Sequence, residues 1–353
     1  MSLQPLFQLL VKYIDVIIFI VFLLLNLVVG LWHRAGKTSF QEYAVGGRNF
    51  STATLTATVV ATWMSGSTLF VTIEKTYSKG LYYIIAVVIG VTSGLLITGR
   101  VIGPRMGKFL DSVSVPEALG KLYGRSIQVI AGISSVLAIM GYVAMQFKVI
   151  ASTLSILLNY DTPWITIIAA TTIILYSTSG GVKAVTFTDV IQFFTFGSLL
   201  PVLALVIWNN MEDTSQVVHV LNTNPLFSFE KVVRWSPEFF STILLLCYYI
   251  TPGLPPPLFQ RMAMARDVTQ IRRSLTYAAL VCLAVELCII WIAILLLADK
   301  PGLEPGKLFH YMVNTYTYAG LKGFLGVGVV ALAMATADSA LNSCAELIAN
   351  DIF

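Results

Sequence analysis

Long apolar stretches, separated by polar segments, run along the whole chain. A helix needs about 20 mostly apolar residues to cross the hydrocarbon core of a membrane. Most of the intervening segments are short, and the two exceptions, 209–237 and 299–320, are polar enough to lie outside the bilayer. The sequence therefore predicts an all-α integral membrane protein with about nine spans, at 13–32, 52–73, 80–103, 126–158, 163–178, 188–208, 238–259, 275–298 and 321–349.

Composition supports the same class of protein. The 353 residues are 57% hydrophobic and 11% charged, whereas soluble domains carry about 25% charged residues. The net charge of +4 is spread out and no basic run is longer than a pair, so we expect no nucleic-acid partner. The three histidines lie far apart in loops, and no hydrolase, metalloprotease or nucleotide-binding motif occurs. We therefore expect neither an enzyme nor a bound cofactor.

The distribution of Lys and Arg predicts an orientation. Cytoplasmic loops of membrane proteins carry an excess of these residues. With the N-terminus outside, the inner loops hold 13 of them, Arg261 included, and the outer side holds 8. The first apolar run has no small-residue cleavage pattern after it, so we interpret it as a span rather than a signal peptide. We expect a multi-pass protein of the cytoplasmic (inner) membrane, with the N-terminus outside and the C-terminus inside.

The second predicted span contains a stretch that is unusually polar, ATWMSGSTLF at 61–70. Five of seven consecutive residues from Thr62 to Thr68 are Ser, Thr or Gly. If the helix unwinds between Ala61 and Gly66, its freed carbonyl groups need partners, and a bound cation supplies them in transporters with discontinuous helices. The alternative is a face of small residues on which another helix packs closely.

The ninth predicted span is also polar on one face. Thr336, Asp338, Ser339, Asn342 and Ser343 recur at near-helical spacing. Hydroxyl and carbonyl oxygens with little formal charge suit a monovalent cation such as sodium, whereas a calcium site would need several carboxylates. Glu346 and Asp351, further along, are interpreted as a helix end in water.

Two further breaks interrupt the apolar pattern. The segment YYITPGLPPPLFQR at 248–261 has four prolines and a glycine, which a regular helix cannot accommodate. Together with the second span it forms a pair of interrupted spans five apart, as in inverted-repeat transporters whose substrate lies between the breaks. Gly180 and Gly181 separate the fifth and sixth spans. Asp189 follows them, and either attracts a cation or caps a helix N-terminus.

Four motifs, in order along the chain, resemble the sodium:solute symporter family, which includes bacterial proline, pantothenate and sugar symporters. They are YAVGGRNF at 43–50, GGVKAVTFTDVIQ at 180–192, QRMAMARDVTQIRRS at 260–274, and ATADSALNS at 335–343 with the terminal NDIF. The resemblance implies a leucine-transporter-type inverted-repeat bundle in a single domain, 1–353. Residues 13–32 would be the extra N-terminal helix, 52–208 the first five-helix repeat, and 238–349 an incomplete second repeat that lacks the last two core helices.

The resemblance also implies site residues. Sodium would be bound by the carbonyl groups of Ala61, Met64 and Leu332 and by the hydroxyl group of Thr336, with Asp189 on the inward ion-release path. The solute pocket would be lined by Trp63, Ser65, Gly66, Tyr248, Tyr249, Pro252 and Pro256. Two positions depart from the family pattern. Ala335 stands where a serine ligand is usual, and Trp63 stands where relatives often have a small polar or acidic residue.

The function implied is sodium-coupled symport of a small organic solute, such as an amino acid or a carboxylate, by alternating access. Sodium is then the coupling ion and no other metal is expected. The partners are the solute, sodium and the lipid bilayer. Two alternatives remain. The chain is the solute-sensing membrane portion of a sensor histidine kinase, since family-like domains occur fused to kinase modules, or it is an inactive truncated fragment.

Overall fold

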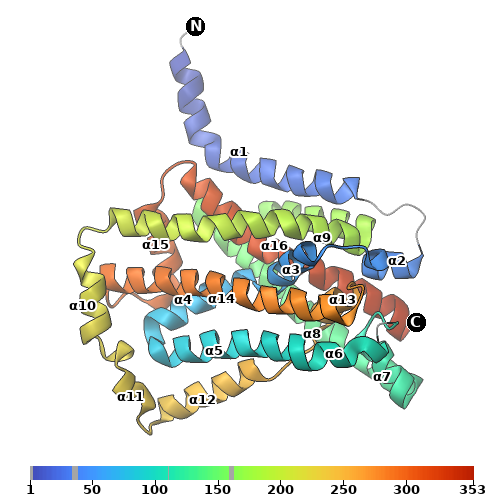
Figure 1. The fold of residues 1–353 in the computed structure, drawn as a ribbon. Helices are drawn as coiled ribbons and strands as arrows, with labels where there is room; N and C mark the ends of the chain where they lie inside the picture. Colours follow the sequence, from blue (N-terminus) through green and yellow to red (C-terminus); the bar gives the residue numbers. More distant parts are fainter. Residues whose placement is uncertain (1–2, 34–38, 110, 159–162) are drawn as a thin grey trace.

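The structure is a computed structural model that describes residues 3–33, 39–109, 111–158 and 163–353. The described part is a bundle of helices without strands (Figure 1). Six of its helices are long and apolar enough to cross a membrane, and the bent pair α3–α4 is a seventh if it counts as one crossing. The all-α prediction is thus confirmed, whereas this helix count does not confirm nine spans.

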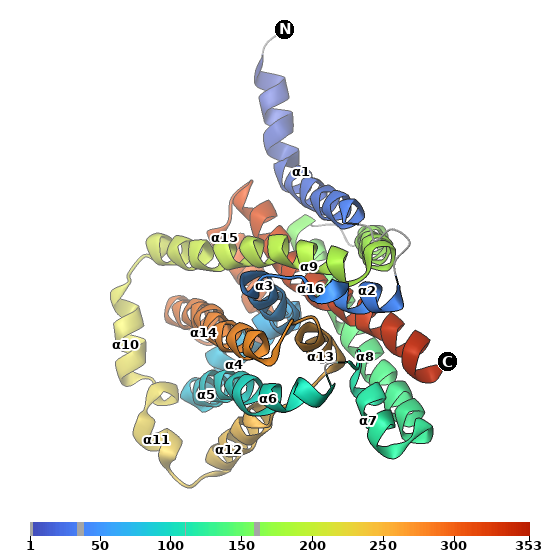
Figure 2. The ribbon, with the colours of Figure 1, turned by 45° about the vertical axis from the view of Figure 1, so that its right-hand side comes forward.

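Several long helices run roughly parallel and others cross them at an angle, and some of the short helices lie at the two ends of the bundle (Figures 1 and 2). The long helices are α1 (Leu3–Trp32), α5 (Leu81–Ile97), α8 (Arg125–Leu158), α9 (Pro163–Asn210), α14 (Val268–Asp299) and α16 (Leu321–Leu347). One end of the bundle carries α10 (Ser215–Thr223), α11 (Phe229–Val233) and α15 (Leu308–Tyr316). The opposite end carries α6 (Gly103–Arg105), α7 (Val115–Tyr123) and the C-terminus. The two polar segments predicted outside the bilayer therefore lie at the same end.

Helix α9 explains part of the difference in span count. It is one continuous segment by its hydrogen bonds, but Gly181 within it has φ 57° and ψ −155°. The Gln192 side chain donates to the Tyr176 hydroxyl at 3.4 Å, although the two residues are 16 positions apart. A straight helix would separate them by about 24 Å. The two legs of α9 therefore fold back on each other, and they correspond to the predicted spans at 163–178 and 188–208.

The second predicted span breaks where its polar stretch indicated. Helix α3 (Thr52–Trp63) and helix α4 (Gly66–Lys79) meet at an angle of 60°. The Met64 amide makes the last bond of α3, to Val60 at 2.8 Å. The Ser65 hydroxyl then caps α4 by accepting from the Thr68 amide at 3.1 Å. A Cβ atom at Gly66 would lie 2.7 Å from Val149 and 3.0 Å from Ala333, so close packing also requires the glycine.

The proline-rich segment divides the seventh predicted span into α12 (Pro237–Ile250) and α13 (Pro256–Ala263). Residues 251–255 between them are not helical. One prediction here was wrong, because Arg261 belongs to no inner loop. Its side chain is on α13 and is 1% exposed. The prolines and basic residues around it form a pattern that is typical of a loop, but in the structure the short helix α13 is buried within the bundle.

Helix α16 lies at the centre of the fold and is buried along most of its length. Helix α1 docks on it through Asp15, whose carboxylate accepts from the Gly320 and Gly323 amides at the start of α16, at 2.8 and 2.6 Å. A carboxylate there also complements the positive end of the helix dipole. Asn26 of α1 accepts from Gln192 of α9 at 3.1 Å. Helix α1 is therefore attached to the bundle by specific polar contacts.

The C-terminal end of α16 differs from the sequence interpretation. Glu346 and Asp351 were expected in water, but they are 2% and 0% exposed. Gln260 of α13 donates to Glu346 at 2.7 Å, and Gln128 of α8 donates to Asp351 at 2.8 Å. Residues from distant parts of the chain thus cover what the local pattern presented as a polar helix end.

The other short helices are α2 (Phe40–Val45) and the turns η1 (Gly46–Arg48), η2 (Thr98–Ile102), η3 (Met106–Phe109), η4 (Pro225–Phe227), η5 (Pro305–Lys307) and η6 (Ile348–Ile352).

Helices α5 and α12 approach closely at two glycines. A Cβ atom at Gly94 would collide with the Tyr249 carbonyl oxygen, and one at Gly90 would lie 2.5 Å from the Tyr249 Cβ. We expect Gly94→Ala to separate the two helices and to destabilise the protein by roughly 1–3 kcal/mol, the usual cost of overpacking. The measurement is the thermal unfolding midpoint of the purified protein in detergent.

Gly141→Ala on α8 is the matched control, because nothing lies within 4 Å of the position that a Cβ atom would take there. Like Gly94→Ala, the Gly141→Ala substitution replaces a helical glycine by alanine, which favours the helix by about 1 kcal/mol, but it creates no clash. A midpoint for Gly94→Ala equal to or above that of Gly141→Ala would contradict the close α5–α12 contact.

Candidate sodium and solute site

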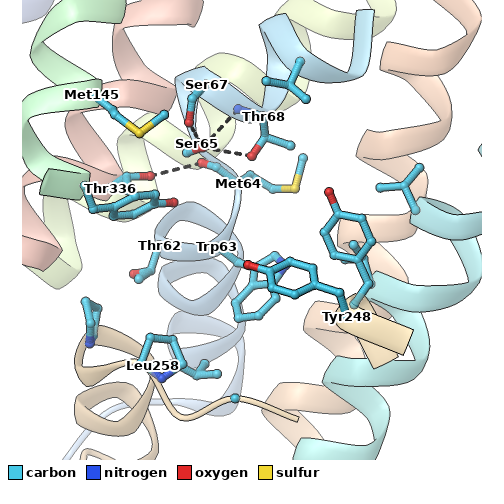
Figure 3. Close-up of a pocket in the computed structure, with 18 of the residues that line it drawn as sticks. Thr62, Trp63, Met64, Ser65, Ser67, Thr68, Met145, Tyr248, Leu258 and Thr336 are labelled. Atoms are coloured by element: carbon cyan, nitrogen blue, oxygen red, sulfur yellow. Dashed lines mark hydrogen bonds between the residues drawn. The ribbon is translucent and has the colours of Figure 1, made fainter. Parts of the chain in front are cut away.

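A cavity of about 1000 Å³ opens at the break between α3 and α4 (Figure 3). Its walls come from both broken helix pairs, α3–α4 and α12–α13, and from α5, α8, α14 and α16. A cavity at such a break is where non-helical backbone is tolerated at membrane depth. Five predicted solute residues line it, namely Trp63, Ser65, Tyr248, Tyr249 and Pro256. The two interrupted segments therefore do face one space, as their spacing predicted.

Two predicted solute residues are not among those that line the cavity. Gly66 is buried behind the break, against Val149 and Ala333. Pro252 is exposed in the segment between α12 and α13. The prediction followed the proline pattern, which locates an interruption but does not tell which of its residues face inward.

The cavity has a strongly aromatic wall. Its rings are those of Trp63, Tyr83, Tyr142, Tyr248 and Tyr249. Tyr248 extends from α12 toward Trp63, beside the broken segment (Figure 3). Tyr83 and Tyr142 are on α5 and α8, outside the two interrupted segments, and no local motif marks them in the sequence. Only the packing of α5 and α8 around the break brings them to the cavity.

One formally charged residue is found among the lining residues of this cavity, Glu286 of α14. No Lys, Arg or His belongs to the lining. In the sequence, Glu286 is the one charged residue within the apolar run 275–298. In the structure Lys148 is exposed on α8, whereas Glu286 accepts a hydrogen bond from the Thr72 hydroxyl at 2.7 Å.

A cluster of oxygen atoms lies at the edge of the cavity, where α16 meets the end of α3. The Thr336 hydroxyl is 3.4 Å from the Met64 carbonyl oxygen (Figure 3). It is also 3.2 Å from the Leu332 carbonyl oxygen. Ala61 lies in the last turn of α3, where carbonyl groups lack a partner further along the helix. The structure thus brings Met64, Leu332 and Thr336 together. Sodium binding by them and by Ala61 stays a prediction.

Asp189 lies in a separate buried network, on the side of Thr336 toward the C-terminal end of α16. Its carboxylate is 3.1 Å from the Arg261 guanidinium, and both side chains are fully buried. Thr58 also donates to it. Asp189 therefore does not cap a helix N-terminus. Its predicted position on an ion-release path is not tested by this geometry, but the cation that it contacts here is Arg261.

Arg261 connects this network to the break. Its guanidinium donates to the Ser339 hydroxyl at 2.5 Å and to the Thr62 hydroxyl at 3.3 Å. Thr62 lines the cavity and contacts Ser339 at 3.1 Å. Residues of α3, α9, α13 and α16 are thereby held together directly beside the candidate sodium site. Sequence reasoning missed this function of Arg261, since its carboxylate and hydroxyl partners are 72 or more positions away in the chain.

A second buried acid, Asp338, lies on the α9 side of α16. The Tyr176 hydroxyl donates to it at 2.6 Å, and Asp338 is 0% exposed. Its other carboxylate oxygen has no hydrogen-bond partner among the described residues. The polar face predicted for α16 therefore points into the protein, toward α3, α9 and α13, rather than toward lipid.

Removing the positive partner of Asp189 should be costly. We expect Arg261→Gln to destabilise the protein by about 3–5 kcal/mol, because it leaves a carboxylate buried without a counter-charge. The measurement is again the thermal unfolding midpoint in detergent. Arg266→Gln is the control, because it alters an exposed arginine of the same sequence motif, and it should have little effect on the midpoint.

The double variant Arg261→Gln/Asp189→Asn should recover part of the loss, because both charges are then removed from the interior. Equal stabilities of Arg261→Gln and the unaltered protein would show that the pair is not buried as described.

Several known transporters are similar to this chain in sequence. The human high affinity choline transporter 1 is 26% identical over 361 residues, covering 95% of this chain and 61% of the relative. The Drosophila melanogaster choline transporter is 24% identical over 355 residues, covering 96% and 56%. The chain thus spans about three fifths of the length of these curated relatives.

A solved structure of a substrate-bound, outward-open Na+-coupled sialic acid symporter has the same fold, with a TM-score of 0.84. It is 19% identical and the match covers 96% of this chain and 74% of that one. Residues 43–353 match the Sodium:solute symporter family. The chain therefore belongs to the sodium:solute symporter family, whose members are membrane transporters rather than enzymes and use sodium as the coupling ion.

Proposed function

We propose that the protein carries out sodium-coupled symport of a small organic solute across the cytoplasmic membrane. The observation that supports this proposal most is the position of Thr336. Its hydroxyl lies against the carbonyl groups of Met64 and Leu332, and the same residue lines the solute cavity. Thr336 would then contact both an ion bound by these oxygen atoms and a solute in the cavity.

The proposed coupling follows from this shared residue. A sodium ion at Thr336 would hold the end of α3 against α16, and so would shape the cavity that receives the solute. Sodium also carries the free energy of the membrane potential, about 2.3 kcal/mol per charge for each 100 mV. The network of Arg261 closes the end of the site toward the C-terminus of α16, and alternating access would require this network to open.

The solute that we propose is a small organic cation. An amino acid or a carboxylate was expected from the sequence, but a carboxylate would find no Lys, Arg or His on the cavity wall. Aromatic rings bind substituted ammonium groups through their negative faces, and five of them line this cavity. The names of several relatives as choline transporters support the same class.

Several finer expectations remain proposals. The chain covers only part of its relatives, so the transport activity of a whole protein is proposed rather than shown. The orientation with the N-terminus outside and the C-terminus inside rests on the Lys and Arg distribution alone. The sensor interpretation and fusion to a kinase module have no supporting observation in the described residues.

The test of the ion site is sodium binding to the purified protein. We expect NaCl, compared with KCl, to raise the thermal unfolding midpoint. Thr336→Val removes the hydroxyl group at nearly constant volume, and should raise the half-saturating sodium concentration about tenfold, which corresponds to about 1.4 kcal/mol. Thr336→Ser is the matched control that keeps the hydroxyl group. An unchanged sodium response in Thr336→Val would overturn the proposed site.

A gain of function tests the same site from the other direction. Ala335 is fully buried beside Thr336, where a serine would add a hydroxyl oxygen. We expect Ala335→Ser to lower the half-saturating sodium concentration in the same assay.

Uptake of labelled choline into proteoliposomes should likewise depend on an inward sodium gradient. Uptake that is equal in sodium and potassium would contradict coupling.

A further inference from the structure

The single acid of the cavity wall is in an unusual position for a membrane protein. Glu286 lies near the middle of α14 and is 3% exposed. An ionisable side chain at that depth is costly and is normally paired or placed at a functional site. Among the described residues, the ion pairs are those of Glu42, Glu117, Asp189 and Glu304, and Glu286 is in none of them.

The polar neighbours of Glu286 are neutral hydroxyl groups. Thr72 of α4 donates to it at 2.7 Å, and the Tyr83 hydroxyl of α5 lies 3.2 Å from Thr72. A glutamine would accept the same hydrogen bond from Thr72, so joining α14 to α4 does not require an acid here. What a carboxylate adds is a negative charge at the wall of an aromatic cavity.

We infer that Glu286 is the residue by which the cavity selects a positively charged solute. Its carboxylate supplies the counter-charge for a substituted ammonium group, and Trp63, Tyr248 and the other rings cover the apolar substituents. This inference rests on the proposed function of the cavity as the solute site. Opposite charges attract each other more strongly in apolar surroundings than in water, so Glu286 should discriminate strongly between a cation and a neutral molecule of the same shape.

Choline and its uncharged carbon isostere, 3,3-dimethyl-1-butanol, are the probes for this test. Binding of each to the purified full chain is measured by calorimetry in saturating NaCl. We expect the unaltered protein to bind choline at least tenfold more tightly than the isostere. Glu286→Gln should weaken choline binding about tenfold or more and leave the isostere nearly unaffected, so that the preference disappears.

Two further variants separate charge from shape. Glu286→Asp keeps the charge and should retain a preference for choline over the isostere. Trp63→Ala, which removes part of the aromatic wall, should weaken the binding of both probes. Glu304→Gln removes an acid that pairs with Lys307 on the surface, and should leave both affinities unchanged.

Three results would overturn the inference. They are unchanged choline binding in Glu286→Gln, equal binding of choline and the isostere to the unaltered protein, and tighter binding of lactate than of choline. The sodium-dependent rise in unfolding midpoint, measured on the same samples, separates these failures from failure of the proposed function. If that rise persists while Glu286 has no effect on charge preference, the sodium site stands and the assignment of Glu286 is wrong.

Discussion

The structure depends on one constraint, which is that backbone polar groups within a bilayer must find partners inside the protein. The interruption between α3 and α4 releases the carbonyl groups of the last turn of α3 at membrane depth. The Thr336 hydroxyl lies against the carbonyl group of Met64, the residue directly after α3, and the Ser65 hydroxyl caps the helix that follows. The polar residues of the second and ninth spans are thus complementary parts of one site, and they are costly only when they are considered separately.

The same constraint acts on charge. Arg261 and Asp189 are fully buried, and each would be strongly unfavourable without the other. Their pairing determines how α13 enters the bundle, because the guanidinium must also satisfy Ser339 and Thr62. An arginine on a short helix after a proline-rich segment can reach that position only if the segment bends inward. The non-helical residues 251–255 allow this bend.

The sequence predicted the fold class, the break near Gly66 and the closeness of Thr336 to Met64, because each of these leaves a local pattern of small and polar residues or belongs to a recognisable motif. It did not predict the burial of Arg261, Glu346 and Asp351. Their partners come from helices that are distant in the chain, and a local pattern of charge resembles a solvated end whether or not another helix covers it. Tyr83, Tyr142 and Glu286 reach the cavity for the same reason, through packing that no motif records.

The glycines of α5 have a mechanical consequence. Gly90 and Gly94 allow the backbone of α12 to lie directly against α5 at Tyr249. Together the two helices carry Tyr83, Tyr248 and Tyr249 of the aromatic wall. Because such close contact opposes separation of the two helices, we expect a change in the width of the cavity to displace them together, with the backbone of the non-helical residues 251–255 absorbing the movement relative to α13.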